Sequence, residues 1–308
     1  MVESSASAKV ILFGEHAVVY GQPAIAVPVS GLRAYAACQP NEPPGQGLII
    51  NAAGRCLVFS TEPALENPLV FTARLVLKVL DLPPPDVTIT LRSDIPIASG
   101  LGSGAAVSTA LARVLVKALN RSLDNESLNA IVYEIEKVHH GTPSGVDNTV
   151  VVYEESVYFL PGLPIERLTI GRPMSLLIAN TGLPASTRVA VNAVRALFDA
   201  TPQQIQPVIN AIGELVAEAR RAIEQGDITR LGNLMQYNHA LLQQLTVSSP
   251  ELDKLVQASL SAGAVGAKMS GGGRGGNMIA LVAPETSIQV KKALLQNGAV
   301  SVFATTVQ

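Results

Sequence analysis

Three short segments, far apart in the chain, carry residue types suited to holding phosphate. They read KVILFGEHAVVYG at 9–21, PIASGLGSGAAVSTA at 96–110 and KMSGGGRGGNMIAL at 268–281. Glycine loses more backbone freedom on folding than any other residue, so a glycine run is costly to order. A chain keeps such a run where its backbone must approach another group closely. We therefore interpret the three segments as parts of one phosphate-handling site.

The second segment places glycines and serines directly before a predicted helix, because the Ala- and Leu-rich stretch at 105–119 contains no Gly or Pro. The start of a helix presents free N–H groups and the positive end of the helix dipole, and both favour phosphate. The alternative is a tight loop whose glycines only let the helix pack closely. The residues predicted to contact the nucleotide here are Ser99, Gly100, Leu101, Gly102, Ser103, Gly104 and Ala105.

Two common phosphate loops do not describe this segment. The Walker loop ends in Gly-Lys-Ser/Thr, and no lysine follows here. Gly100, Gly102 and Ala105 match a dinucleotide fingerprint formally, but Pro96 interrupts the strand that should precede it. The nearest acid, Asp124, falls between two predicted helices. We therefore expect neither a P-loop nor a dinucleotide-binding domain.

Two carboxylates flank a predicted turn. Glu136 is near the end of a helix, and Asp147 follows the Gly-Thr-Pro-Ser-Gly turn. One carboxylate could bind Mg²⁺ while the other takes a proton, which is what phosphoryl transfer needs. Alternatively, Asp147 caps the turn and Glu136 lies on a solvated helix face. A zinc site with His139 and His140 is disfavoured, because adjacent histidines usually point apart.

The first segment contributes charged side chains. Lys9 opens a predicted strand, and Glu15 and His16 follow the turn at Gly14. A lysine beside a carboxylate base favours the ionised base and offsets charge that develops on a transferred group. The alternative is an ordinary surface lysine.

The third segment has a formal G-x-G-x-x-G match, but a strand-like NMIALV follows it, which again disfavours the dinucleotide motif. Gly272 and Gly273 could close over phosphates, and Arg274 offers a fork of donors suited to phosphate oxygens. The alternative is a hairpin with a solvent-exposed arginine.

The elements that must position these residues mix strands and helices without a regular βαβ rhythm, which favours an α+β fold. β-rich runs predict strands at 9–13, 24–29, 47–50, 55–59, 87–93, 174–180, 278–282 and 300–304, and a hairpin at 150–153 and 156–160. Apolar spacing predicts helices at 68–80, 105–119, 125–140, 186–199, 202–225, 228–245, 250–262 and 285–296. The Pro- and Gly-rich stretch 161–173 predicts a boundary between domains at 1–168 and 169–308.

Length and composition limit the class of protein. The 308 residues, 48% apolar and 15% charged, predict a globular chain with one large or two ordinary domains. A net charge of −2 without a basic run argues against nucleic acid and favours a small-molecule ligand. No segment resembles a secretory signal or a membrane span, so we expect a soluble, cytoplasmic protein. Cys38 and Cys56 fit no metal-site spacing and are predicted to be reduced thiols.

The three segments together resemble the motifs of the kinase superfamily named after galactokinase, homoserine kinase, mevalonate kinase and phosphomevalonate kinase, the GHMP kinases. They occur in the same order, and the resemblance spans nearly the whole chain. KVILFGEHAVVYG, HGTPSGVDN at 140–148 and NTGLPASTRVAV at 180–191 are most similar to the mevalonate kinase family.

This resemblance implies a two-domain GHMP-kinase fold of the α+β class. Its N-terminal, nucleotide-binding domain is mixed β/α with a left-over-right type βαβ unit, and its C-terminal domain is a ferredoxin-like α/β sandwich. It also implies ATP and Mg²⁺ as cofactors, mevalonate as the substrate phosphorylated on its primary hydroxyl, and a homodimer.

The same resemblance implies roles for single residues. Asp147 would be the catalytic base, and Lys9 would be its charged partner. Glu136 and a serine of the glycine loop, Ser103, would bind Mg²⁺. The residues implied to lie on the mevalonate side of the cleft are Glu15, His16 and Thr187.

Two motifs depart from the family pattern. The second motif usually reads Gly-Ser-Ser-Ala, and this chain has Ser103-Gly104, so Ser103, water or backbone must replace the missing hydroxyl. The third motif usually reads Gly-Ala-Gly-Gly-Gly-Gly, and Gly272 and Arg274 replace the alanine and one glycine. Arg274 either contacts a phosphate or is simply tolerated.

Two alternatives to mevalonate phosphorylation stay open. One is a sibling enzyme, namely a phosphomevalonate kinase, a mevalonate-diphosphate decarboxylase or a sugar kinase. A phosphorylated substrate would call for extra basic residues, and the predicted pocket segments offer mainly Lys9 and Arg188, which favours an unphosphorylated acceptor. The other is a non-catalytic nucleotide-binding relative.

Overall fold

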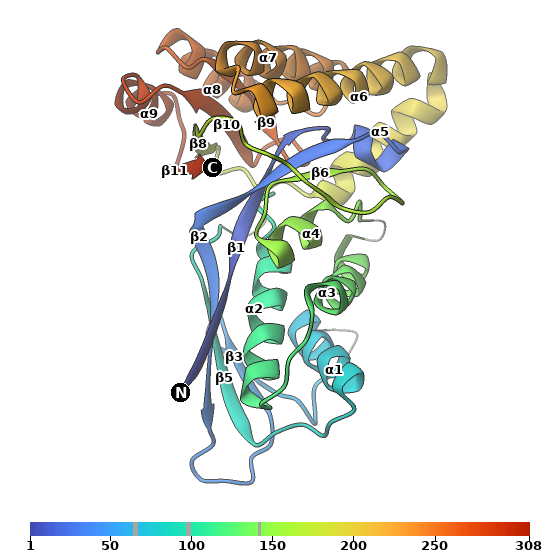
Figure 1. Ribbon diagram of the computed structural model, residues 1–308, viewed down its shortest axis with the longest axis vertical. Coiled ribbons are helices and arrows are strands. Elements are labelled where there is room, and N and C mark those ends of the chain that lie inside the picture. The colour runs from blue at the N-terminus through green and yellow to red at the C-terminus, as the bar shows by residue number, and fades with distance from the viewer. Residues whose placement is uncertain (64–66, 97–99, 141–142) are drawn as a thin grey trace. The chain divides into compact units, whose positions relative to one another are not determined.

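The computed structural model describes residues 1–63, 67–96, 100–140 and 143–308 (Figure 1). The chain forms two compact units, which we describe separately. Unit 1 contains residues 1–8, 32–96 and 102–154, and unit 2 contains residues 9–31, 97–101 and 155–308. Strands β1 (Val2–Phe13) and β2 (Ala24–Pro40) contribute residues to both units. The domain boundary predicted at 168 stays a prediction.

Unit 1 is a sheet with helices packed beside it. The strand order is β4 (Arg55–Val58), β3 (Ile49–Ala52), β5 (Val87–Ser93), β2, with β3 and β5 parallel and the other pairs antiparallel. Helix α2 (Ser103–Ala118) packs on β5 and is flanked by α1 (Pro68–Leu80), α3 (Asn125–His140) and α4 (Val146–Tyr153) (Figure 1). The buried side of α2 supplies a large part of the core of unit 1, including Leu111, Val114 and Leu115.

Unit 2 contains an antiparallel sheet with the strand order β11 (Ser301–Val307), β8 (Met174–Asn180), β10 (Asn277–Val282), β9 (Gly266–Ser270). Counted along the chain, this order is 4-1-3-2, as in ferredoxin-like folds. The connections carry α5 (Thr187–Ala200), α6 (Pro202–Gln225), α7 (Ile228–Gln244), α8 (Pro250–Ser261) and α9 (Ser287–Gln296). The predicted α+β class and the ferredoxin-like C-terminal sheet are confirmed.

The start of β2 carries a second, smaller group of strands in unit 2. Its residues 24–26 pair with β6 (Val157–Phe159), and β6 pairs with β7 (Glu166–Arg167). The 3₁₀ helix η1 (Ala17–Tyr20) connects β1 to β2.

Two glycines bring α7 close to β9, the strand that leads into the third glycine segment. A Cβ on Gly232 would lie 2.3 Å from the carbonyl oxygen of Val265, and a Cβ on Gly266 would lie 2.4 Å from the Cα of Gly232. Real Cβ atoms do not come this close to backbone, so only glycine allows this packing. β9 is therefore held rigidly against α7.

The predicted hairpin at 150–153 and 156–160 is wrong in its first half, because residues 146–153 form helix α4. The β-branched residues that suggested a strand, Val150, Val151 and Val152, are all fully buried in unit 1. A short helix surrounded by other elements can bury valines on all sides, and such packing overrides their preference for strands. The second half is confirmed as β6.

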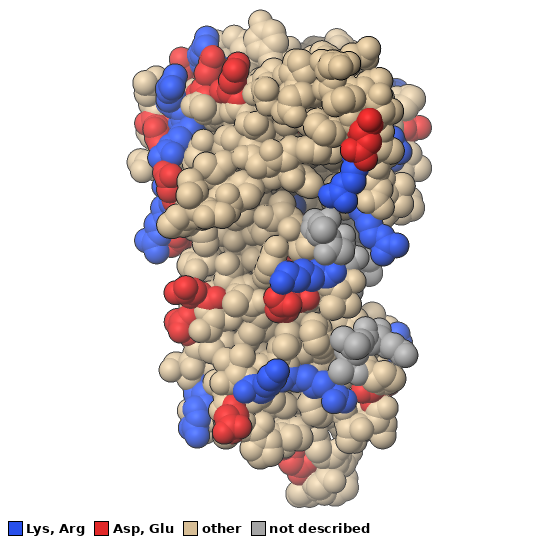
Figure 2. All heavy atoms as spheres, turned by 90° about the vertical axis from the view of Figure 1, so that its right-hand side faces the viewer, with Lys and Arg blue, Asp and Glu red and all other residues tan. Residues whose placement is uncertain are grey.

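Cys38 is buried, Cys56 is exposed, and both are free thiols. Within the described ranges, the helices are each too short or too polar to cross a membrane. On the face in Figure 2, Lys and Arg side chains lie among Asp and Glu side chains and larger uncharged areas.

Candidate functional site

The predicted site residues are divided between the two units. Unit 1 contains Gly102, Ser103, Gly104, Ala105, Glu136 and Asp147. Unit 2 contains Lys9, Glu15, His16, Gly100, Leu101, Thr187, Gly272, Gly273 and Arg274. Ser99 lies outside the described residues.

In unit 1, helix α2 begins at Ser103. Its N-cap, Gly102, has a φ of 71°, a left-handed conformation that suits glycine. The carbonyl of Gly102 accepts a hydrogen bond from the N–H of Ala106 at 2.9 Å, so the first turn has regular helical geometry. Gly102 has no side chain that could cap this end, and the first-turn amides of Ser103, Gly104 and Ala105 have no acceptor within the helix. These amides and the helix dipole suit an anion.

Glu136 on α3 lies beside this helix start. Its side chain is 3% exposed, so the alternative of a solvated helix face is wrong. A Cβ on Gly104 would lie 3.4 Å from Oε1 of Glu136, which places the carboxylate next to the first turn of α2. Mg²⁺ is commonly held by one or two carboxylates together with substrate phosphates, and Glu136 offers such an oxygen beside the start of α2. The residues present therefore fit a magnesium–phosphate complex.

Asp147 is the second residue of α4, whose N-cap, Gly145, has a φ of 90°. The next residue, Asn148, is buried and donates from Nδ2 to Oδ1 of Asn129 on α3 at 2.7 Å. This hydrogen bond fixes the start of α4 against α3, the helix that carries Glu136. Unit 1 therefore carries both predicted carboxylates on two helices that pack together.

The zinc alternative rests on His139 and His140, whose side chains lie outside the described residues. In the remainder of the described chain, no three His, Cys, Asp or Glu side chains are grouped so as to hold a metal ion.

In unit 2, parts of all three glycine-rich segments are in contact. The amide N–H of Lys9 donates to the carbonyl of Leu101 at 3.0 Å. A Cβ on Gly271 would lie only 3.4 Å from the Cα of Gly100, so these two backbones run against each other. Ser270 Oγ donates to the carbonyl of Ile11 at 2.8 Å, which joins the first segment to the third.

Buried charges lie next to this contact. Lys9 is 2% exposed, so the alternative of a surface lysine is wrong. Glu15 is 1% exposed and pairs with Lys268 on β9, which is fully buried. Burial raises the pKa of Glu15, and the positive charges of Lys268 and Lys9 oppose that rise. Burial also lowers the pKa of Lys268, against the effect of Glu15.

Sequence reasoning missed Lys268. The available signal was a lysine in the apolar run GAKMS that leads directly into the glycine cluster. A lysine in a strand that is buried throughout is rare and calls for a charged partner.

His16 joins the first segment to the third. Its Nε2 lies 2.9 Å from the carbonyl oxygen of Gly272, and the side chain is 6% exposed. Burial lowers the pKa of His16 to about 4, so the imidazole is neutral near pH 7. Because a carbonyl only accepts, Nε2 carries the proton and Nδ1 is left as an acceptor.

Thr187, the first residue of α5, packs on the other side of Gly272. A Cβ on Gly272 would lie 2.9 Å from the Cα of Thr187 and 3.1 Å from its Oγ1. Unit 2 therefore brings together His16, Gly272 and Thr187, three residues that the sequence predicts for the site.

Arg274 is exposed and makes its contacts with the loop after α7. Its Nε donates to the carbonyl of Thr246 at 3.2 Å, and its Nη2 lies 3.4 Å from Thr246 Oγ1. The neighbouring Gly273 could not be replaced, because a Cβ there would lie 2.0 Å from the carbonyl oxygen of Val247. The turn is thus fixed to the end of α7, and contact of Arg274 with a nucleotide stays a prediction.

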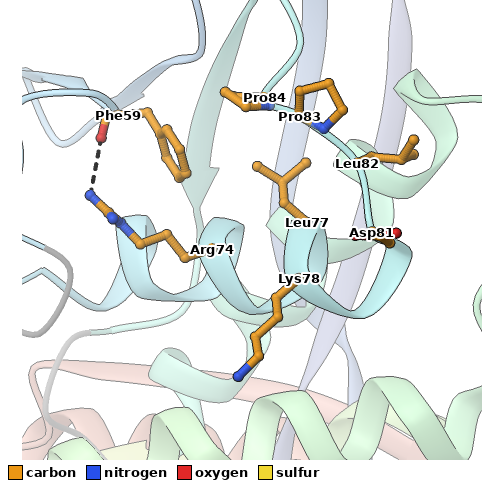
Figure 3. Close-up of a pocket in the computed structure, with 8 residues that line it drawn as sticks. All are labelled: Phe59, Arg74, Leu77, Lys78, Asp81, Leu82, Pro83 and Pro84. Atoms are coloured by element: carbon orange, nitrogen blue, oxygen red, sulfur yellow. Dashed lines mark hydrogen bonds between the residues drawn. The ribbon is translucent and has the colours of Figure 1, made fainter.

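A cavity of about 420 Å³ in unit 1 contains none of the predicted site residues (Figure 3). It lies at the end of α1, where Arg74 stacks on the ring of Phe59 at 5.0 Å and donates to that residue's carbonyl at 3.4 Å. The other lining residues are Leu77, Lys78, Asp81, Leu82, Pro83 and Pro84.

Comparison with known proteins gives consistent matches over both units. The GHMP kinases N terminal domain matches residues 67–155, and the GHMP kinases C terminal domain matches residues 219–301. The mevalonate kinase of Pyrococcus horikoshii is 35% identical over 95% of this chain and 92% of its own length. That of Pyrococcus abyssi is 35% identical over 96% of this chain and 92% of its own length.

Solved structures agree in fold. The crystal structure of L. major mevalonate kinase in complex with R-mevalonate has a TM-score of 0.85 at 29% identity and covers 100% of this chain and 96% of that one. The Methanococcus jannaschii mevalonate kinase has a TM-score of 0.87 at 24% identity, over 99% and 98% of the two chains.

Proposed function

Because the chain belongs to the mevalonate kinase family of the GHMP kinases, we propose that it phosphorylates the primary hydroxyl of (R)-mevalonate with ATP. The products are 5-phosphomevalonate and ADP. The observation that carries the proposal is the similarity to mevalonate kinases over nearly the full length of the chain. The helix start beside Glu136 and the buried polar residues around Gly272 are the local features that support it.

On this proposal, the residues of unit 1 act on the phosphates and on the attacking hydroxyl. The first-turn amides of α2 hold phosphate oxygens, and Asp147 orients the hydroxyl and accepts its proton. Lys9 of unit 2 offsets charge that develops on the transferred group. Bound Mg²⁺ would neutralise charge on the phosphates, and Glu136 would hold it. Gly104 has no side-chain oxygen, so Ser103, water or backbone would complete the ligand set.

The residues proposed to contact mevalonate are Glu15, His16 and Thr187, all in unit 2. Glu15 is buried and pairs with Lys268, and the imidazole of His16 is neutral near pH 7. Such surroundings offer hydrogen bonds to the hydroxyl groups of the acceptor.

The proposal is tested by measuring ADP release with ATP, Mg²⁺ and a panel of acceptors: mevalonate, phosphomevalonate, galactose and homoserine. We expect turnover with mevalonate and background rates with the others. Turnover confined to another acceptor would assign the chain to a sibling activity, and ATP binding without any turnover would support a non-catalytic relative.

The proposed base is tested with Asp147→Asn. Loss of a positioned base typically lowers the rate about 10²- to 10⁴-fold. We expect such a loss in kcat with the affinity for ATP retained, measured by nucleotide titration. Near-normal turnover would show that Asp147 is not the base.

Two further points remain proposals of the same kind. We propose a cytoplasmic location, tested by cell fractionation, and a homodimer, tested by light scattering of the purified chain.

A further inference from the structure

Lys268, the buried partner of Glu15, has no part in the mechanism described so far. Both side chains are almost completely buried, and Lys268 donates a second hydrogen bond to the carbonyl of Met269 at 2.7 Å. Removing two charges from water is so unfavourable that a buried ion pair is often no more stabilising than apolar residues of the same size. Fold stability alone is therefore a weak reason for a chain to keep this pair.

The two oxygens of Glu15 are used differently. Oε1 accepts from Lys268, whereas Oε2 is buried and has no hydrogen-bond partner among the described residues. A buried oxygen of an ionised carboxylate without a donor is unfavourable, and a donor that arrives with a ligand removes that penalty. Oε2 of Glu15 is therefore available to accept a hydrogen bond from a ligand.

The surroundings of Oε2 indicate which ligand would supply the donor. Glu15 directly precedes His16, which binds Gly272, and Gly272 packs against Thr187. The positive charge of Lys9 also acts on Glu15. These neighbours include the residues proposed to contact the acceptor substrate, and that substrate carries hydroxyl groups that can donate.

Glu15 is fixed at both ends. Its backbone carbonyl accepts the N–H of Ala17 at 2.7 Å, and Lys268 holds its carboxylate. β9 is fixed in turn, because the N–H of Met269 donates to Nδ1 of His239 at 3.3 Å and Nε2 of His239 lies 3.0 Å from Asp253. Lys268 therefore approaches Glu15 from a strand with little freedom to shift.

We propose that Lys268 is a positioning residue for the acceptor alcohol: it holds Glu15 by one oxygen so that Oε2 accepts a hydrogen bond from a substrate hydroxyl. The inference rests on the proposed mevalonate kinase activity and deepens it, because it adds a residue of β9 to the binding of the acceptor. Lys268 itself does not touch the substrate.

The first test is Lys268→Met in the full-length chain. A hydrogen bond to a charged group is worth about 10- to 100-fold in binding, so we expect the KM for mevalonate to rise by that factor while the KM for ATP stays unchanged. Lys268→Arg, which keeps the charge, should recover part of the loss. The matched control is Lys291→Met on α9, an exposed lysine whose removal should leave both KM values unchanged.

Stability is separated from positioning by a double variant, Glu15→Gln with Lys268→Met. The single variant leaves a buried unpaired charge and should unfold at lower urea, whereas the double variant removes both charges and should recover the wild-type midpoint. We expect the KM for mevalonate to stay high in the double variant, because its glutamine is no longer held. Recovery of KM together with stability would overturn the inference, and the double variant decides the matter even if the single variant does not fold.

The pH profile is a second readout that a merely structural role would not change. Among the described residues, the charge of Lys9 acts on Glu15, and the charge of Lys268 acts on His16 and His239. Without Lys268, the pKa of Glu15 rises, so the acid limb of kcat/KM for mevalonate should move to higher pH. An unmoved limb together with an unchanged KM would overturn the inference.

The outcomes also separate this inference from the proposed function. If the wild type does not turn over mevalonate, the proposed function fails, and the inference fails with it. If the wild type is active and the Lys268 variants keep the wild-type KM, only the inference fails.

Discussion

The buried histidine gives a quantitative prediction about how stability changes with pH. Burial lowers the pKa of His16 from 6.5 to about 4, so the folded chain keeps this imidazole neutral where the unfolded chain protonates it. Between these two values, the unfolded state binds more protons at this residue. The free energy of unfolding therefore rises with pH through the window and falls as the solution is acidified.

The size of the effect follows from the two pKa values. Each unit of separation is worth about 1.4 kcal/mol when the whole window is crossed. Between about pH 7.5 and about pH 5, His16 should account for a loss of about 2 kcal/mol in the free energy of unfolding. The shift is caused mainly by burial, and the charges of Arg274 and Lys268 act in the same direction, whereas the hydrogen bond to Gly272 opposes it.

The perturbation is His16→Gln, which removes the titration and keeps a side-chain amide that can reach the carbonyl of Gly272. Urea unfolding followed by circular dichroism suits this chain, which contains no Trp. The variant should lose about 2 kcal/mol less than the wild type between the two pH values. Any pH-independent change in the free energy of unfolding caused by the substitution is the same at both pH values and cancels in the difference.

His239 is the main competing source of acid sensitivity, because burial lowers its pKa as well. It is present in both proteins, so its contribution also cancels. Equal pH dependence in wild type and variant would refute the reasoning, because it would mean that His16 titrates alike in the folded and unfolded states.

Two further substitutions test contacts, one in each unit. Gly272→Ala should destabilise unit 2 by about 1 to 3 kcal/mol, because its Cβ would lie 2.9 Å from the Cα of Thr187. The same change should raise the KM for mevalonate. Wild-type values in urea unfolding and in kinetics would contradict this prediction. Glu154→Gln should destabilise unit 1 by about 1 to 3 kcal/mol in urea unfolding. The reason is that the Glu154 carboxylate accepts hydrogen bonds from Arg33 at 2.9 and 3.0 Å and from Arg113 at 2.8 Å. An unchanged unfolding midpoint would show that these hydrogen bonds make no net contribution to stability.

The helices and strands that could be predicted are those with a clear local signal. The helix at 68–80 begins at Pro68 after the cap Asn67 and is found as predicted, as is the strand at 87–93. The helix at 125–140 is also confirmed. Their sequences carry periodicity, capping residues and breakers within a few positions, and such signals do not depend on distant parts of the chain.

The failures depend on contacts that the sequence does not display. Val150, Val151 and Val152 predict a strand because β-branched residues favour strands. They lie in helix α4 instead, where all three are buried in unit 1. β9 is not predicted from the sequence, because its last three residues, 268–270, belong to the third glycine-rich segment. The importance of Lys268 appears only when Glu15, more than two hundred residues away, is found beside it.

Arg274 shows how a motif can depart from its family without a loss of structure. Its φ is 60°, in the left-handed region that usually selects glycine and costs an L-residue about 1 to 2 kcal/mol. Three hydrogen bonds offset that cost: the N–H to Val247 at 2.7 Å, Nε to the carbonyl of Thr246 and Nη2 to its hydroxyl. These contacts explain why arginine is tolerated at this position, and they do so without any phosphate. A phosphate role for Arg274 would have to come from the N–H groups of Nη1 and the second N–H of Nη2, which these three bonds do not use.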